Sequence, residues 1–198
     1  EETMSTSSIG EWNKFWSRRD LGVTPTRKNL FKKFAKIKLP ENAKILDVGC
    51  GSGTLARFWK EQGYDVIGLD ISDESLEIAR RKGIYCVKGD VTKGLPFDDN
   101  TFDLVYSDGL LEHFVDPKPI LEEIFRVSRR YVLTMVPRNT ITNLIHNTIM
   151  RPPKEYRRKD FEWINMHKCL CKNLVEVDRI GFGKLPLPPH LLYILCEK

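Results

Sequence analysis

The stretch Lys44-Ile-Leu-Asp-Val-Gly-Cys-Gly-Ser-Gly-Thr54 decides the fold of this chain. It begins as a short apolar strand, runs into a turn with a glycine at every second position, and continues into a helix that we expect over 54–62. Because Gly49, Gly51 and Gly53 lack a side chain, a ligand can approach bare backbone there, and the turn can adopt positive φ angles. The free N–H groups at the start of the following helix point back at the same turn. The stretch therefore predicts a site for a nucleoside-bearing ligand.

A glycine-rich turn of this kind can hold either a dinucleotide or a cationic nucleoside ligand. Dinucleotide-binding proteins use the pattern Gly-x-Gly-x-x-Gly, but counting from Gly49 the third glycine is replaced by Thr54. Asp47, just before the turn, is an unfavourable neighbour for a pyrophosphate and a favourable one for a cation. A second acidic residue, Asp70, follows the next apolar strand. The pattern thus favours a cationic nucleoside ligand over a dinucleotide.

The order Asp-x-Gly-x-Gly-x-Gly, with an acid after the second strand, closely resembles motif I of the class I S-adenosylmethionine-dependent methyltransferases. The resemblance continues in the right order over about residues 43–137. Gly89-Asp-Val91 follows a third strand, and Leu95–Ser107 is similar to the family's approach to its fourth strand. Asp108-Gly-Leu-Leu-Glu-His-Phe114 resembles the small-molecule branch, type 11. The resemblance implies an enzyme that uses S-adenosyl-L-methionine as its cofactor and methyl donor.

Strands and helices alternate along the chain, which predicts an α/β fold with a doubly wound parallel sheet. The expected parallel strands are 44–48, 65–69, 85–88, 102–106 and 131–136. The resemblance implies a Rossmann-like, seven-stranded sheet that is completed by a C-terminal antiparallel hairpin. Val175–Ile180 and Leu192–Cys196 fit the two strands of that hairpin.

The length of 198 residues fits one methyltransferase domain, residues 1–198, with four parts. We expect an N-terminal helical lid at 1–40, a cofactor-binding core at 41–137, a substrate lid insertion at 138–160, and a C-terminal helix and hairpin at 161–198.

Charge is distributed unevenly over these parts. Residues 45–137 carry a net charge of −5, whereas the two flanks each carry +5. An acidic core suits a cationic cofactor, and basic lids suit an anionic substrate, although the same side chains can also be solvated helix faces. The candidate cations that would face the substrate are Arg18, Arg19, Arg157 and Arg158.

In open α/β sheets, ligands bind beyond the carboxyl ends of the strands. By resemblance, nine residues at these ends are expected to bind the cofactor: Asp47, Gly49, Gly51, Gly53, Asp70, Ile71, Asp90, Val91 and Ser107. The glycines would lie under the methionine part, with Asp47 near its ammonium group. Asp70 would accept both ribose hydroxyls, because one carboxylate can bind a vicinal diol with two oxygens.

The adenine and the methyl acceptor involve the later motifs. Asp90 would accept from the adenine amine, with Ile71 and Val91 against the ring faces; as an alternative, Asp90 is a turn-forming acid. The backbone of Ser107 would line the channel to the acceptor. His113 is the candidate general base, which is needed only when the acceptor must lose a proton. The alternative for His113 is a structural histidine that bonds to backbone.

The sequence predicts no metal site, because Cys169-x-Cys171 beside His167 lacks the second ligand pair of a zinc site. Five cysteines at irregular spacing indicate reduced thiols and a cytoplasmic location. Since no apolar run approaches the length of a membrane span, we expect no membrane association. The oligomeric state is left open.

The motifs do not define the acceptor, because this fold hosts many chemistries. We expect a small, anionic metabolite that is methylated at O, N, S or C. One alternative is an RNA or protein methyltransferase, since aromatic residues are interleaved with the basic flanks. The aromatic residues concerned are Trp12, Trp16, Tyr156, Phe161 and Trp163, of which Trp163 is expected in the core. Another alternative is a non-catalytic, cofactor-binding partner subunit.

Overall fold

The computed structural model describes residues 8–17, 25–138, 158–180 and 191–198. The helices within these ranges are α1 (Ile9–Trp16), α2 (Pro25–Phe34), α3 (Thr54–Glu61), α4 (Asp73–Arg81), α5 (Lys118–Val127) and α7 (Asp160–Lys168), with the short 3-10 helices η1 (Val91–Lys93) and η2 (Leu111–His113). The strands are β1 (Lys44–Val48), β2 (Asp65–Asp70), β3 (Tyr85–Lys88), β4 (Phe102–Asp108), β5 (Ser128–Pro137), β6 (Asn173–Ile180) and β7 (Leu191–Glu197).

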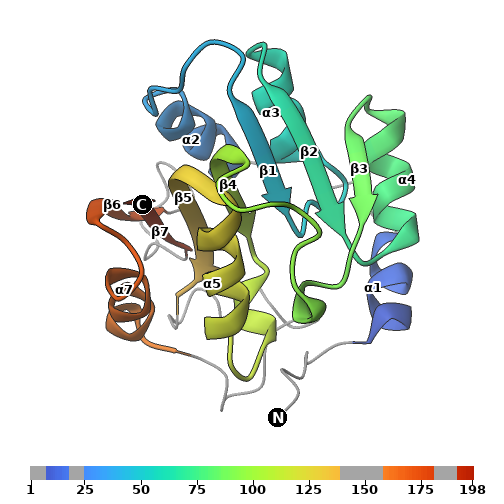
Figure 1. Cartoon of the computed structure of the whole chain (residues 1–198). Coiled ribbons are helices and arrows are strands. Elements are labelled where there is room, and N and C mark those ends of the chain that lie inside the picture. Colours follow the sequence, from blue (N-terminus) through green and yellow to red (C-terminus); the bar gives the residue numbers. More distant parts are fainter. Residues whose placement is uncertain (1–7, 18–24, 139–157, 181–190) are drawn as a thin grey trace.

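The seven strands form one sheet in the order β3-β2-β1-β4-β5-β7-β6 (Figure 1). The first five strands in this order are parallel, and β7 lies antiparallel between β5 and β6. This arrangement confirms the predicted fold, including the C-terminal hairpin. Both hairpin strands extend slightly beyond the predicted ranges, because their backbone pairing continues at polar end residues such as Asn173 and Glu197.

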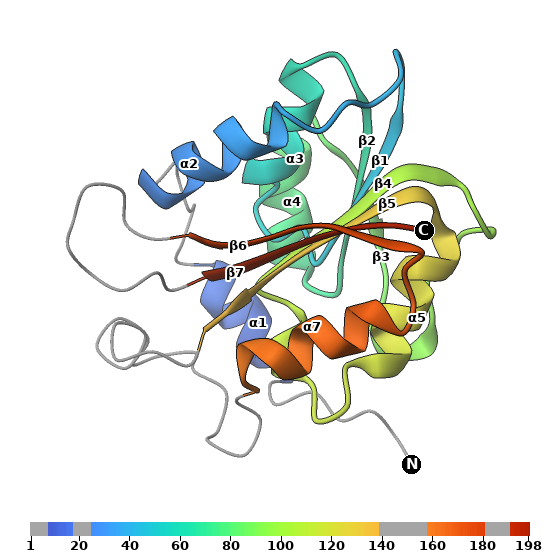
Figure 2. The same cartoon turned by 90° about the vertical axis from the view of Figure 1, so that its left-hand side faces the viewer.

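Helices cover both faces of the sheet (Figure 2). Helices α2, α3 and α4 lie on one face, where Phe34, Trp59 and Leu76 belong to one buried cluster. Helices α5 and α7 lie on the other face, where Leu121 and Trp163 belong to a second cluster. Trp163 is 2% exposed, which confirms that it belongs to the core. Within the described ranges, no helix is long and apolar enough to cross a membrane.

The two N-terminal helices occupy different places. Helix α1 lies at the edge of the domain where the parallel strands end, next to α4 (Figure 1). A capping box fixes its start: the Ser8 hydroxyl accepts from the Glu11 N–H, and the Glu11 carboxylate accepts from the Ser8 N–H. Helix α2 instead packs near β6, where Lys33 pairs with Glu176 and Asp178. Of the lid expected over 1–40, α1 is therefore the described part that lies close to the strand ends.

A buried histidine joins α7 to the central sheet. His167 Nδ1 lies 2.7 Å from the Trp163 carbonyl oxygen, and Nε2 lies 2.8 Å from Thr134 Oγ1 on β5. Since a carbonyl can only accept, Nδ1 carries the proton and Nε2 accepts from the threonine hydroxyl. Burial lowers the pKa of His167 to about 4. Both ring nitrogens are thus used within the fold, in the neutral form.

We expect this histidine to make folding sensitive to acid. Its pKa is depressed, so the unfolded chain takes up a proton below about pH 6.5 that the folded chain binds only near pH 4. Stability is therefore retained above pH 6.5 and lost as the pH falls, by about 2 kcal/mol between pH 7 and pH 5 for this group. Urea unfolding at both pH values would measure the loss, and His167→Gln is the control that should lack it. If the difference in free energy of unfolding between the wild type and His167→Gln is the same at pH 7 and at pH 5, this explanation is contradicted.

Candidate functional site

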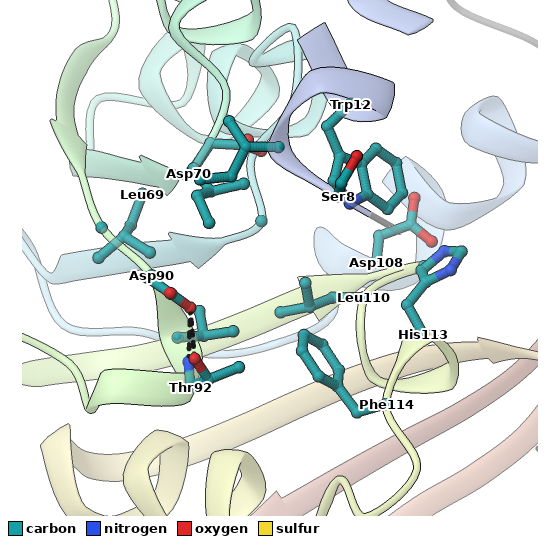
Figure 3. A pocket seen from close by; sticks show the side chains of 16 residues that line it. Ser8, Trp12, Leu69, Asp70, Asp90, Thr92, Asp108, Leu110, His113 and Phe114 are labelled. Atoms are coloured by element: carbon teal, nitrogen blue, oxygen red, sulfur yellow. Dashed lines mark hydrogen bonds between the residues drawn. The ribbon is translucent and has the colours of Figure 1, made fainter. Parts of the chain in front are cut away.

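A cavity of about 320 Å³ lies at the carboxyl ends of the parallel strands (Figure 3). Its wall is formed by the turn after β1, the end of β2, the segments after β3 and β4, and the start of α1. Six of the ten predicted site residues lie in this wall: Gly49, Asp70, Ile71, Asp90, Val91 and His113. The other four, Asp47, Gly51, Gly53 and Ser107, are not wall residues; Ser107 directly precedes the wall residue Asp108, and Asp47 and Gly51 lie two positions from Gly49.

The glycine turn is fixed to the end of β2. The N–H groups of Gly49 and Cys50 both donate to the Leu69 carbonyl oxygen, at 2.8 and 3.0 Å. Gly49 has a φ of 75°, and a Cβ there would lie 3.1 Å from the nearest side-chain carbon of Leu110. The absence of a side chain thus keeps the cavity floor as bare backbone, which fits a ligand held against the turn.

Asp70 connects this turn to the helix that follows β2. Its Oδ2 accepts from the Gly51 N–H at 2.8 Å, and its Oδ1 accepts from the Ser72 N–H at 2.9 Å. Burial raises the pKa of Asp70, and the two backbone donors oppose that shift. Because each carboxylate oxygen can accept more than one hydrogen bond, both can still accept from a vicinal diol in the cavity.

Asp90 caps a turn and also lines the cavity. Its Oδ1 accepts from the N–H and the hydroxyl of Thr92, at 3.0 and 2.7 Å, so that the side chain caps η1 as a turn-forming acid (Figure 3). The same side chain is 28% exposed and lines the cavity beside Val91 and Ile71. Capping one oxygen leaves Oδ2, 3.8 Å from Lys93 Nζ, available to an amine donor.

Asp47 lies beneath the cavity and not in its wall. It is 2% exposed, and its Oδ2 accepts from the Tyr106 hydroxyl at 2.6 Å. Burial raises the pKa of Asp47 to about 8, so this side chain is largely uncharged at neutral pH. The structure therefore gives Asp47 no direct contact with the cavity. Ser107 is also buried, and its Oγ has no hydrogen-bond partner among the described residues.

His113 lies at the end of the cavity that α1 covers. Its ring packs edge-to-face on Trp12 with 4.9 Å between the ring centroids, close to Asp108 (Figure 3). It also hydrogen-bonds to the backbone of Gly109, as the structural alternative anticipates. Burial lowers the pKa of His113 to about 4, so the ring is neutral at neutral pH and can accept a proton.

Sequence reasoning missed the acid next to this histidine. Glu112 is 7% exposed, and its Oε1 lies 4.0 Å from His113 Nε2. Burial raises the pKa of Glu112 to about 8. The signal available in the sequence was an acidic residue in an otherwise apolar segment, between Leu111 and Phe114.

The basic residues expected to face a substrate are only partly described. Arg18, Arg19 and Arg157 lie outside the described residues. Arg158 donates to the carbonyl oxygens of Phe114 and Val115, and its guanidinium lies 5.3 Å from the centre of the Trp163 ring.

The charged residues of the described cavity wall are all acidic, since no lysine or arginine of the described ranges lies in it. They are Asp70, Asp90 and Asp108. This wall fits the predicted cofactor, because S-adenosylmethionine carries a positive charge on sulfur and a diol on its ribose.

Comparisons with known proteins identify the class of protein that this chain resembles. Residues 46–132 match the family model described as "Methyltransferase domain". The malonyl-[acyl-carrier protein] O-methyltransferase of Salmonella typhimurium is 35% identical over 44% of this chain and 35% of its own length. The demethylmenaquinone methyltransferase of Renibacterium salmoninarum is 38% identical over 43% of this chain and 37% of its own length. The chain thus matches little more than a third of the length of these curated relatives.

Among solved structures, a chain in the complex between the Haloferax volcanii Trm112 methyltransferase activator and a methyltransferase has a TM-score of 0.73 at 20% identity, covering 98% of this chain and 97% of that chain. The fold is that of the class I S-adenosylmethionine-dependent methyltransferases. Residues 46–132 thus match the type 11 branch of the methyltransferases, as their motifs predicted.

We expect Gly53→Ala to disrupt the turn for two separable reasons. Gly53 has a φ of 69°, and its added Cβ would lie 2.9 Å from Ala79 Cβ on α4. Gly63→Ala is the matched control, because Gly63 has a φ of 90° and nothing within 4 Å of an added Cβ. Backbone strain should cost about 1 kcal/mol at both sites, and the clash should add about 1–3 kcal/mol at Gly53. Denaturant unfolding measures both losses, and equal losses would contradict a steric role for α4.

Proposed function

We propose that this domain binds S-adenosylmethionine in the cavity and methylates a small acceptor that enters beside His113. The observation that carries the proposal is the Asp70 carboxylate, which lies in the cavity wall next to the bare backbone of Gly49. A diol-binding acid beside a glycine turn suits a nucleoside, and the acidic wall suits its cationic sulfur.

Different residues of the cavity wall bind different parts of the cofactor. Asp70 orients the ribose, and the Gly49 backbone supports the amino-acid part. Asp90 accepts from the adenine amine, while Ile71 and Val91 pack on the ring. The bound cofactor supplies a methyl group on a positively charged sulfur. The protein's main contribution is to align the acceptor with that carbon and to exclude water, and alignment of this kind can lower the barrier by about 7–11 kcal/mol.

The acceptor end is formed by α1 and the segment after β4. Trp12 and His113 meet there edge-to-face, and Leu110 and Phe114 complete an apolar wall. This surface suits the uncharged body of a small molecule and excludes water from the reacting atoms. The two relatives differ in the acceptors that their names give, malonyl-[acyl-carrier protein] and demethylmenaquinone. Membership of the family therefore supports a methyl acceptor without defining it.

The anionic character of the acceptor is part of the proposal and rests on the basic flanks. Since the described wall is acidic, an anionic group would be held away from the sulfur, by the segments at 1–40 and 138–160 that we propose as lids. Of the four candidate arginines, Arg158 is the one that the structure describes, and it donates to the carbonyl oxygens of Phe114 and Val115.

The acceptor class can be tested by transfer of labelled methyl from S-adenosylmethionine into a cell extract separated into small-molecule, RNA and protein fractions. We expect label in the small-molecule fraction, and an anion-exchange step would then test its charge. Label in RNA or protein would replace this acceptor class. Label that appears only after a second protein is added would favour the partner-subunit alternative, as in the Haloferax volcanii complex with an activator.

We expect Asp70→Ala to weaken the binding of S-adenosylmethionine by about 100-fold, because two charge-assisted hydrogen bonds to ribose are lost. Isothermal titration calorimetry measures the affinity. Asp65→Ala, at the exposed start of the same strand, removes the same charge far from the cavity and should bind normally. Equal affinities for the two variants would remove Asp70 from the site.

We expect His113→Ala to lower turnover on a protic acceptor by about 100-fold, the lower range for loss of a general base, because a histidine with so low a pKa is a weak base. Affinity for the cofactor should be unchanged, since His113 contacts the acceptor end. Steady-state kinetics and calorimetry on the same preparation separate the two effects. If turnover is unchanged, His113 is a structural residue.

A further inference from the structure

A carboxyl group is buried directly behind His113. Glu112 lies in η2, and its Oε2 has no hydrogen-bond partner among the described residues. Its Oε1 lies 4.0 Å from His113 Nε2, and both side chains are only 9% exposed. A buried carboxyl oxygen without a hydrogen-bond partner costs folding free energy, so a carboxyl group at this position calls for a functional reason.

The charged groups at this end of the cavity do not provide that reason. Asp108, at the end of β4, is acidic and disfavours a second negative charge. Arg158 donates hydrogen bonds to the carbonyl oxygens of Phe114 and Val115. On the side of α1, His113 meets the uncharged ring of Trp12. Within the described ranges, His113 is therefore the one ion-pair partner of Glu112.

We propose that Glu112 and His113 act as a pair that takes up the proton of a protic acceptor, a hydroxyl, enol or amine. This inference rests on the proposed function. His113 lies in the cavity wall and touches the acceptor, whereas Glu112 lies behind it and is a positioning residue. As the bond from the acceptor atom to the methyl carbon forms and the carbon–sulfur bond breaks, the acceptor proton moves to His113. The carboxylate of Glu112 stabilises the imidazolium, and the proton then passes to solvent.

The charge states of the pair set its pH dependence. Burial raises the pKa of Glu112 to about 8 and lowers that of His113 to about 4, so the pair holds one proton between these values. Stabilising an imidazolium requires the ionised carboxylate, which becomes the major form above pH 8. Turnover on a protic acceptor should therefore rise with pH, by about tenfold from pH 7 to pH 9.

The pairing is tested without any acceptor, by NMR of the histidine rings against pH. The chain has four histidines, and the signal of His113 is identified by its absence in His113→Gln. In the wild type we expect the His113 ring signal to shift with a midpoint near pH 8, as Glu112 ionises beside it. The shift should be lost in Glu112→Gln, which keeps the size of the side chain.

Two controls belong to this experiment. Glu122→Gln removes an exposed carboxylate on α5, 3.7 Å from Lys118, and should keep the shift. The signal of His167, buried between α7 and β5, should be unchanged in both variants and so report an intact fold. A wild-type His113 signal without a step near pH 8, or a step that survives in Glu112→Gln, would overturn the pairing.

Kinetics test the role in proton uptake. Glu112→Gln should lose the tenfold rise between pH 7 and pH 9 while its affinity for S-adenosylmethionine stays the same. A rise that persists in Glu112→Gln would reject this role even if the NMR step is present. Failure of the proposed function is distinguishable, because it would appear as absent cofactor binding in the wild type, whereas the NMR result depends on neither cofactor nor acceptor.

Discussion

The Asp70 carboxylate is the interaction on which the site depends. One oxygen accepts from Gly51 in the turn after β1, and the other accepts from Ser72 at the start of α4. A single side chain thus joins the ends of two adjacent parallel strands, β1 and β2, to the helices that follow them. Hydrogen bonds from backbone N–H groups are close to linear, and the carboxylate group is planar. These two bonds therefore fix the orientation of the Asp70 carboxylate, including the lone pairs of its oxygens that are not yet used. The geometry that holds the turn is the same geometry that presents two acceptor oxygens to the cavity, so stability and ligand binding are coupled at this residue.

Burial divides the acidic residues of the core into two groups. Asp47 and Glu112 are enclosed, and desolvation raises the pKa of each to about 8, so that they add little negative charge at neutral pH. Asp90 and Asp108 lie in the cavity wall with Asp70. The field that a cationic ligand meets therefore comes from the wall residues and not from the acid of the glycine motif. The enclosed acids serve other purposes: Asp47 accepts from Tyr106 within the sheet, and Glu112 lies against His113.

The sequence was sufficient for the fold and for bringing six of the predicted site residues to one cavity wall, because both depend on local patterns. The turn at Gly49 follows β1 directly, Asp70 ends β2, and Asp90 lies two residues after β3, so position along the chain predicts position in space. Long-range contacts were not predictable in this way. The burial of Asp47 depends on Tyr106, which is 59 positions away in the sequence, and the environment of His113 depends on Trp12. Glu112 was quoted only as part of a motif, since its burial and its distance to the His113 ring depend on the folded chain.

The family motifs predict some of the residues that line the cavity and do not predict others, and this difference bears on the choice of methyl acceptor. The family match spans residues 46–132 and therefore includes the turn, Asp70, Asp90 and His113, whereas α1 lies outside it. Trp12 of α1 nevertheless packs on His113 and closes the acceptor end of the cavity. A ligand common to the family needs the same wall in every member, but different acceptors need different closing surfaces. The choice of acceptor is thus expected to depend on α1, which lies outside the matched region. A substitution of Trp12 should therefore alter acceptor preference more than the affinity for the cofactor.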